Sequence, residues 1–297
     1  MAVIKSFSVG NGDMYYIRHG SDNFTIIDCN LSDDNADRII TELKRQSAGK
    51  NVRRYICTHP DGDHFGGIEL LDAEMPIKNF YVVRNQAIKP STSESFKHYC
   101  ELRDSDKAFY ISKGCTRKWM NQSDEERKGA GVQILWPDTQ NKHFKEALQQ
   151  AAEGKAYNNT SAVIRYAIGD TSFMWLGDLE TEFMESIVDS IELEKTTVVF
   201  AAHHGRQSGR IPHSWLDKLD PQIIVIGEAP SRELHYYGGY KTITQNSAGD
   251  ITFDCDGEQT HIYSSIESFK PTEFKNLGKT AFKHYVGSFT AETTYTP

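Results

Sequence analysis

Four potential metal ligands stand within six residues of one short segment, and this feature most constrains what the 297-residue chain can become. The segment reads His59-Pro60-Asp61-Gly62-Asp63-His64, between a β-rich run at 54–57 and the glycine pair at 66–67. Carboxylates this close repel each other and buried imidazoles need partners, so the arrangement is costly without a cation. A divalent metal pair would satisfy all four side chains and generate hydroxide at neutral pH. The alternative is an acidic surface turn with two incidental histidines.

Strand-like and helix-like segments alternate along the chain, which predicts an α/β sandwich. The first three strands are short and joined by turns, so they predict an antiparallel meander. Strands are expected within residues 3–9, 14–18, 24–29, 52–57, 131–137, 157–166, 172–178, 197–205 and 221–227. Helices are expected at residues 32–46, 141–152 and 180–190, and one more opens at the glycine pair.

Composition limits the classes of function. A net charge of −8 means that the surface as a whole does not attract nucleic acid, so a polyanion needs a local basic patch or bound metal. Apolar runs fall short of the roughly 20 residues that a membrane helix needs, and the N-terminus lacks the pattern of a signal peptide. The five cysteines are scattered without a C-x-x-C pair, which is typical of free thiols in a reducing cytoplasm. We therefore expect a cytoplasmic protein without a membrane partner.

The ligand-rich loop resembles the His-x-His-x-Asp-His signature of the metallo-β-lactamase superfamily. His59, Asp63 and His64 match it, and Asp61 stands where the family has its second histidine. An oxygen ligand is harder than imidazole, which shifts the expected metal preference toward manganese or magnesium.

Two N-terminal segments narrow the resemblance. Residues 9–13 read Val-Gly-Asn-Gly-Asp and residues 26–29 read Ile-Ile-Asp-Cys. They look like the opening of the soluble hydrolase domain of ComEC-type DNA-uptake proteins, although Gly10 and Gly12 also fit a plain hairpin turn. The resemblance implies a four-layer αβ/βα metallo-β-lactamase sandwich over residues 1–265, with a helical insertion at about 85–131. Residues 266–297 form a C-terminal extension without a counterpart.

The insertion carries nine basic against seven acidic residues, with aromatic residues between them. Cations and stacking rings would suit a lid over a nucleic-acid strand. A solvated helical hairpin that buries these rings in its own small core fits equally well.

Two later segments complete the predicted metal site. Asp178 ends an apolar strand, where it could be an N-cap, and the resemblance implies that it bridges two metals. His203 and His204 follow another strand and would point in opposite directions, one toward the metals and one toward their surroundings or the substrate. Both His203 and His204 are therefore candidate metal ligands. Arg206 could contact a scissile phosphate or simply be solvated.

Four further residues are candidates for substrate binding. Asn158, Asn159 and Ser161 match an Asn-x-x-Ser type of signature that the resemblance places where other members of the superfamily have a histidine. They could orient a water molecule or a phosphate oxygen, or form a turn before a strand. His235 is a candidate replacement for the histidine of a family Tyr-Gly-His-Pro segment, which residues 237–240 lack.

The resulting hypothesis is a metal-dependent phosphodiester hydrolase, a nuclease acting on DNA. The expected ligands of two divalent ions, zinc or manganese with magnesium possible, are His59, Asp61, Asp63, His64, Asp178, His203 and His204. Among them, Asp63, Asp178 and His204 are assigned to catalysis. Nucleic acid is the expected partner, together with a protein of an anti-phage defence or DNA-processing system. The alternatives are a hydrolase of cyclic nucleotides or other small phosphodiesters, and a degenerate metal-free binding subunit.

Overall fold

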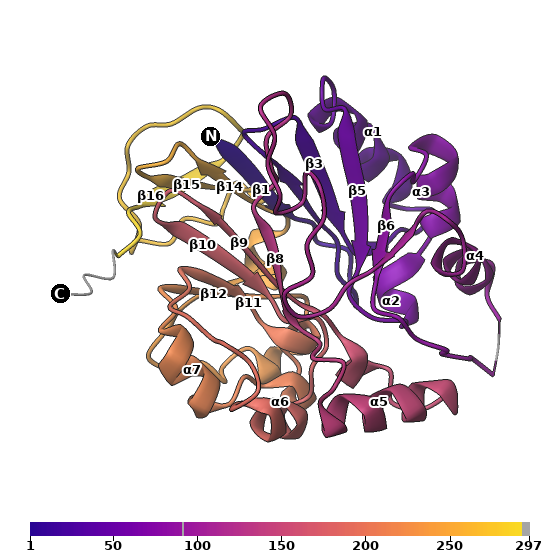
Figure 1. Ribbon diagram of the computed structural model, residues 1–297. Coiled ribbons are helices and arrows are strands. Elements are labelled where there is room, and N and C mark those ends of the chain that lie inside the picture. The colour runs from indigo at the N-terminus through magenta and orange to yellow at the C-terminus, as the bar shows by residue number, and fades with distance from the viewer. Residues whose placement is uncertain (91, 293–297) are drawn as a thin grey trace.

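The computed structural model describes residues 1–90 and 92–292, and it arranges two β-sheets with helices on their outer sides (Figure 1). The first sheet has nine strands, in the order β16-β15-β14-β1-β2-β3-β5-β6-β7. Their bounds are β1 Ala2–Ser6, β2 Tyr15–Arg18, β3 Asn23–Ile27, β5 Val52–Cys57, β6 Phe80–Val82, β7 Ala108–Tyr110, β14 Ile251–Cys255, β15 Thr260–Ser264 and β16 Tyr285–Phe289. The short β4 (Cys29–Asn30) follows β3.

The second sheet has six strands, in the order β13-β12-β11-β10-β9-β8. Their bounds are β8 Val132–Trp136, β9 Val163–Ile168, β10 Thr171–Trp175, β11 Val198–Phe200, β12 Ile223–Ile226 and β13 Lys241–Thr244. Strands β10 to β13 run parallel to one another, so their carboxyl ends meet at one edge of the sheet. Active sites of open α/β sheets form at such edges.

Helices cover the outer face of each sheet. In Figure 1, α1, α3 and α4 lie beside the first sheet, and α5, α6 and α7 lie beside the second. The helix bounds are α1 Ala36–Gln46, α2 Gly62–Phe65, α3 Ile68–Glu74, α4 Glu94–Arg103, α5 Lys142–Ala152, α6 Thr181–Ile187, α7 His213–Leu219 and α8 Gln245–Ala248. This arrangement confirms the predicted α/β class and the predicted sandwich of two sheets between outer helices.

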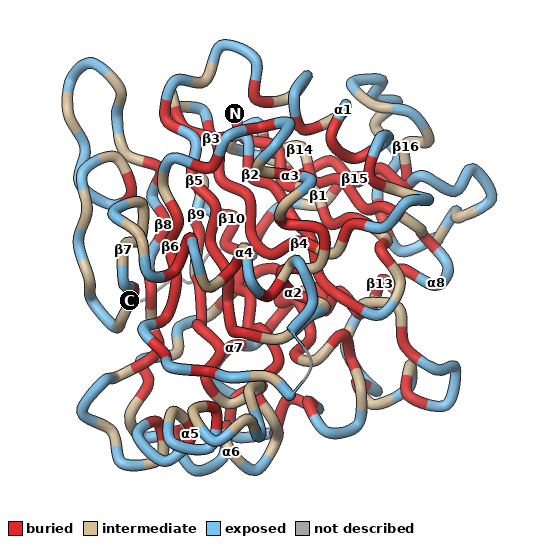
Figure 2. Tube along the Cα trace, turned by 90° about the vertical axis from the view of Figure 1, so that its right-hand side faces the viewer, coloured by how far each residue is buried: buried red, intermediate tan, exposed pale blue. Residues whose placement is uncertain are grey.

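Alternation along the strands explains why the first sheet is covered on both faces. In β1, Ile4 packs between the two sheets, whereas Val3 packs into a second core beneath α1, α3 and α4. In β5, Ile56 and Tyr55 divide in the same way, because successive side chains of a strand point to opposite faces. Figure 2 shows the consequence, with buried residues concentrated in the strands and exposed residues in the peripheral loops.

The meander β1-β2-β3 is antiparallel as predicted. The predicted strand over residues 197–205, in contrast, ends at Phe200. His203 and His204 have φ angles of 51° and 55°, which lie in the left-handed region and break the extended backbone. The two histidines therefore belong to a tight turn, and strand alternation does not determine their directions.

The segment at 85–131 is partly built into the fold. Strand β7 pairs with β6 at the edge of the first sheet, and Phe96 and Tyr99 of α4 are buried in the core that contains Phe65. Trp119 lies toward the beginning of β5, where its carbonyl accepts a hydrogen bond from Arg54. The rings of Phe96 and Tyr99 instead pack against Phe65, just after the metal loop, and both are buried, so they belong to the core and are not exposed for stacking.

Residues 285–289, within the predicted C-terminal extension, form β16 and pair with β15. This strand closes one edge of the nine-stranded sheet. None of the described helices combines the length and the apolar character that crossing a bilayer would require.

Candidate metal centre

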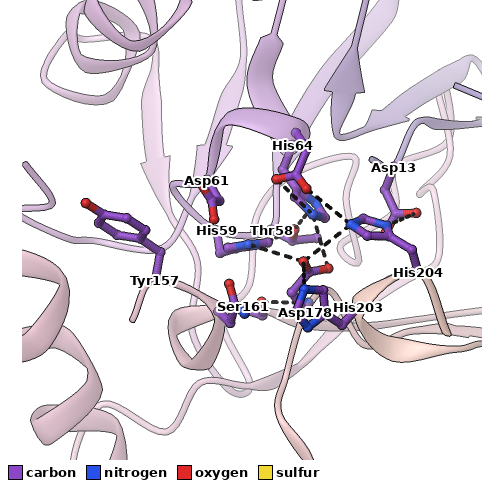
Figure 3. Close-up of polar contacts among 12 residues, drawn as sticks. Asp13, Thr58, His59, Asp61, His64, Tyr157, Ser161, Asp178, His203 and His204 are labelled. Carbon is purple, nitrogen blue, oxygen red and sulfur yellow. Dashed lines mark hydrogen bonds and ion pairs between the residues drawn. The ribbon is translucent and has the colours of Figure 1, made fainter. Parts of the chain in front are cut away.

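Four buried side chains from distant parts of the chain meet at one point (Figure 3). Each offers a ligand atom, and these atoms all lie within 4.8 Å of one another. The four residues are Asp13, His64, Asp178 and His204. Asp13 comes from the β1–β2 loop and His64 from α2, whereas the other two follow β10 and β11. The two sheets therefore both contribute to the group.

His64 is oriented by the carboxylate of Asp28. Its Nδ1 atom lies 2.9 Å from Asp28 Oδ2, and the Thr58 backbone N–H and hydroxyl both donate to the same carboxylate at 2.7 Å. This leaves His64 Nε2 free to face Asp178, whose Oδ1 lies 3.1 Å away. A carboxylate that fixes the tautomer of a histidine is the usual support of a metal-binding imidazole.

Asp178 lies at the middle of the group. Its backbone N–H donates to Ser161 Oγ at 2.9 Å, and Gly177 before it has a φ of 53°. Three histidine Nε2 atoms lie within 4 Å of Asp178 Oδ2, at 3.9 Å for His59, 3.7 Å for His203 and 3.4 Å for His204. A carboxylate surrounded in this way has the geometry of a shared ligand.

The paired histidines take different positions in their turn. His204 is buried, and its Nδ1 lies 3.2 Å from Asp13 Oδ1, which also accepts a hydrogen bond from Tyr15. His203 is more exposed, and its Nδ1 lies 2.8 Å from Ser208 Oγ. His204 is therefore the inner residue and His203 forms the rim.

Asp63 lies at the opening of the group. Its Oδ2 is 3.4 Å from His204 Nε2, and its Oδ1 is 3.9 Å from His64 Nε2. The side chain is 24% exposed, whereas that of Asp178 is 2% exposed. Asp63 is thus far more accessible to solvent than Asp178.

Several buried polar atoms of this group make no well-directed hydrogen bond among the described residues, although His64 Nε2 and His204 Nδ1 face carboxylate oxygens at 3.1 and 3.2 Å. They are His59 Nε2, His64 Nε2, Asp178 Oδ1 and both ring nitrogens of His204. Leaving a buried polar atom unsatisfied costs about 1–3 kcal/mol, so such a concentration requires an explanation. A divalent cation would satisfy these atoms together, and imidazole with carboxylate suits zinc or manganese. The residues present therefore fit a divalent metal.

The protonation states reflect the crowding. Burial lowers the pKa of His59 to about 4, helped by the nearby charge of His64. Burial acts in the same direction on His64 and His204, but neighbouring carboxylates outweigh it and raise the pKa of both. For Asp178 the charges of these two histidines overcome burial and hold its pKa well below the usual range. His59 is therefore neutral and ready to coordinate, whereas His64 and His204 must release protons to do so.

Asp61 is engaged elsewhere. Its Oδ1 accepts from the Gly62 backbone N–H at 2.7 Å, which makes it the N-cap of α2, and it pairs with Lys89 Nζ at 2.5 Å. Asp61 lies near His59 in Figure 3 but is not one of the four clustered ligands. The structure thus brings together the other predicted ligands and gives Asp61 a different partner.

The predicted substrate-binding residues are divided. Asn159 Nδ2 donates to Glu180 Oε2 at 2.9 Å, and Asn158 reaches the other carboxylate oxygen at 3.5 Å. Both amides are therefore occupied by Glu180, whereas Ser161 supports Asp178. His235 is exposed in a turn and forms no hydrogen bond or ion pair with another described residue.

Arg206 lies beside the centre. Its guanidinium donates to the side chain of Asn11, and its buried Nε has no partner among the described residues. Together with His203 it lines an open cavity of about 790 Å³. Arg206 is thus placed where a substrate could approach from the side of His203.

Sequence reasoning missed Asp13 and Asp28. Asp13 lies in the motif at 9–13 and Asp28 in the motif at 26–29. These motifs were interpreted through their glycines and their turn, and no role was assigned to the two aspartates. An aspartate that directly follows the apolar residues of a strand was the available signal for Asp28.

Comparisons with known proteins agree with this architecture. Residues 8–94 match the family model described as the metallo-beta-lactamase superfamily. Over 187 residues the chain is 23% identical to ComE operon protein 3 of Bacillus subtilis (strain 168), covering 63% of the chain and 21% of that protein. The chain therefore spans about a fifth of the length of this curated relative.

Two solved structures resemble the chain at a TM-score of 0.49 each. One is the E377D mutant of the CmlA beta-hydroxylase, with 12% identity over 86% of this chain and 54% of that one. The other is Tm1679, a metal-dependent hydrolase of the beta-lactamase superfamily, with 10% identity over 82% and 96%. The match at residues 8–94 and the two-sheet architecture confirm the resemblance recognised in the sequence. The chain thus combines a segment that matches the metallo-beta-lactamase superfamily with a mixed α/β architecture and a candidate metal site.

Proposed function

We propose that the chain is a metal-dependent phosphodiester hydrolase that cleaves DNA. The observation that supports it best is the buried group of histidine nitrogens and carboxylate oxygens that lie within 4.8 Å of one another, beside which Asp63 is open to solvent. The preference for DNA rests on the resemblance of residues 9–13 and 26–29 to ComEC-type DNA-uptake proteins. All five cysteines lie in the described ranges as free thiols, which supports a cytoplasmic setting.

Asp63, His64, Asp178 and His204 would hold a divalent ion, with Asp13 beside them. His59 with Asp178 offers a second position, and zinc or manganese, then magnesium, are the ions to test. A bound divalent ion would lower the pKa of a water molecule and stabilise the charge that develops on a phosphate.

The chain itself supplies position and proton control. Asp28 fixes the His64 tautomer, and Ser161 fixes the backbone of Asp178. Asp63 at the opening would orient the attacking water, and Arg206 in the adjacent cavity would contact a non-bridging phosphate oxygen. Nucleic acid is the proposed partner, and a protein of a defence or DNA-processing system is a further one.

The test uses the full chain, stripped of metal and then supplied with Mn²⁺ or Zn²⁺, on plasmid, single-stranded DNA, RNA and cyclic dinucleotides. Asp63→Ala should lower the cleavage rate about a hundredfold or more, the scale of a positioned catalytic group. Asp34→Ala, at an exposed aspartate before α1, should cleave at the wild-type rate. Cleavage that persists in EDTA or in Asp63→Ala would refute the proposal, and cleavage of cyclic dinucleotides alone would move it to small phosphodiesters.

The pairing of Asp61 with Lys89 favours one second candidate, a metal-free binding subunit, because it consumes a predicted ligand. Metal analysis of the purified chain separates the two. Less than about half a metal ion per chain would favour the binding subunit, and at least one ion per chain would favour the hydrolase.

A further inference from the structure

We propose that the ammonium of Lys89 occupies the His59 side of the centre as a built-in cation, so that the site binds one divalent ion tightly instead of two. The inference deepens the proposed function and rests on its metal-binding part. It assigns Lys89 as a residue that sets the number of metals and that faces the substrate phosphate.

The position of Lys89 is the first observation. Its Nζ lies 2.5 Å from Asp61 Oδ1, and Asp61 stands where the metallo-β-lactamase signature has its second histidine. The ammonium therefore contacts the side chain that would otherwise bind a metal together with His59. A divalent ion placed on that carboxylate would meet a like charge at close range, which is strongly unfavourable where solvent is scarce.

Lys89 is also held in place. Its side chain is 16% exposed, and its Nζ lies 4.3 Å from the ring centre of Tyr157 and 5.7 Å from that of Phe65. Such cation–π contacts help to hold the ammonium at this position. The Tyr157 hydroxyl donates to the Ile88 carbonyl at 2.6 Å, so the ring that covers the ammonium also anchors the backbone beside it.

The ligands are distributed unequally around Asp178. On one side lie Asp63, His64 and His204, with Asp13 within reach of the last. On the other side lies His59, at 3.9 Å from Asp178 Oδ2, while His203 Nε2 approaches the same oxygen from the more exposed rim at 3.7 Å. Three polar side chains that the sequence offered for this side have other partners, because Asn158 and Asn159 bind Glu180 and Ser161 binds the Asp178 backbone.

One side of the centre is thus suited to a divalent ion and the other to the lysine. An ammonium has three donors, and the Lys89–Asp61 contact uses one of them. The remaining donors would be available to a phosphate oxygen. Lys89 would then provide, as a fixed charge, part of the electrostatic stabilisation that a second metal provides elsewhere.

Metal counting tests the inference without any cleavage assay. The metal-stripped full chain is titrated with MnCl₂ by calorimetry, and bound manganese is counted after desalting and by electron paramagnetic resonance. Wild type should bind one ion tightly and show no exchange-coupled pair. Lys89→Ala should bind a second ion at least about tenfold more tightly than wild type does, with an exchange-coupled signal, because the competing charge is gone.

Two further variants complete the series. Lys89→Arg should keep the wild-type count, since it keeps the charge, and Lys155→Ala, at an exposed lysine beyond α5, should change nothing. Circular dichroism checks the fold of each variant, and if Lys89→Ala is unfolded the wild-type count and the arginine variant decide. Two equally tight ions in wild type, or an unchanged second site in a folded Lys89→Ala, would overturn the inference. A wild type that binds one ion and cleaves no DNA would instead refute the nuclease proposal and leave this inference standing.

Discussion

At the scale of single residues, the centre depends on backbone conformations that few side chains adopt. Asp28, His203 and His204 all have φ angles between 51° and 56°, and Gly177 before Asp178 has 53°. Non-glycine residues rarely occupy this left-handed region, and such strain gathers at functional sites. The strain here lies in the turns that present the proposed ligands and their supports.

Gly177 offers a test of that arrangement. A Cβ at Gly177 would lie 2.7 Å from Ser161 Oγ and would have to adopt the left-handed conformation. Gly177→Ala should therefore lower the free energy of unfolding by about 1–3 kcal/mol. Gly238→Ala, where the new Cβ has nothing within 4 Å, should change it by less than about 0.5 kcal/mol. Denaturant unfolding of the metal-free protein measures both, and equal values for the two variants would contradict the argument.

The sequence indicated several residues of the candidate site, but it could not indicate which side chains contact one another. His59, His64 and Asp178 follow strand ends in a recognisable spacing, so the sequence could indicate them. The Asp61–Lys89 and Asn159–Glu180 pairs are tertiary contacts between segments without a shared motif, so no local pattern could indicate them. The roles of the site residues remain predictions.

At the scale of elements, caps explain where predicted helices begin. The helix predicted from Asn141 begins as α5 at Lys142, because the Asn141 side chain accepts from the backbone N–H groups of His143 and Phe144. The helix predicted from Ser32 begins later, at Ala36, because a turn across Ser32 and Asn35 precedes it.

Asn141→Ala should destabilise the protein by about 1 kcal/mol, since two backbone donors lose their acceptor. Asn141→Asp keeps an acceptor oxygen at the same place and should lose much less. Thermal and denaturant unfolding of the two variants provide the measurement. Equal free energies of unfolding for Asn141→Ala and Asn141→Asp would show that the Asn141 side chain does not stabilise the start of α5.

The sequence predicts that a strand exists more readily than it predicts which other strand that strand pairs with. Apolar periodicity indicates that a segment is extended, yet β1 pairs with β14 near the opposite end of the chain. The register of such a pair is decided by the packing of both faces and not by either strand alone. For the same reason β16 could not be foreseen from the polar residues around it.

At the scale of the whole molecule, stability should depend on pH through a histidine far from the metal centre. His19 is buried, and its Nε2 lies 2.8 Å from Thr25 Oγ1. Burial and the charges of Arg54 and Lys50 lower the pKa of His19 well below its ordinary value. Below pH 6.5 His19 is therefore protonated in the unfolded chain but stays neutral in the folded chain. The free energy of unfolding consequently falls as the pH falls.

The expected size is up to about 1.4 kcal/mol per pH unit below pH 6.5 for this group. His19→Gln should remove that component, so its free energy of unfolding should decline less steeply than that of wild type between pH 6.5 and 5.5. Both proteins are measured by urea unfolding in a chelator, which keeps the metal centre out of the comparison. Parallel pH profiles would show that His19 does not contribute.

The ligands of the candidate centre come from both sheets, His64 from the first and Asp178 and His204 from the second. An ion seated there would join the two halves of the sandwich as a cross-link does, and it would be released as soon as they separate. Metal binding at this centre would consequently depend on an intact interface between the sheets. A partially opened molecule would release the ion and, with it, lose any activity that the ion supports.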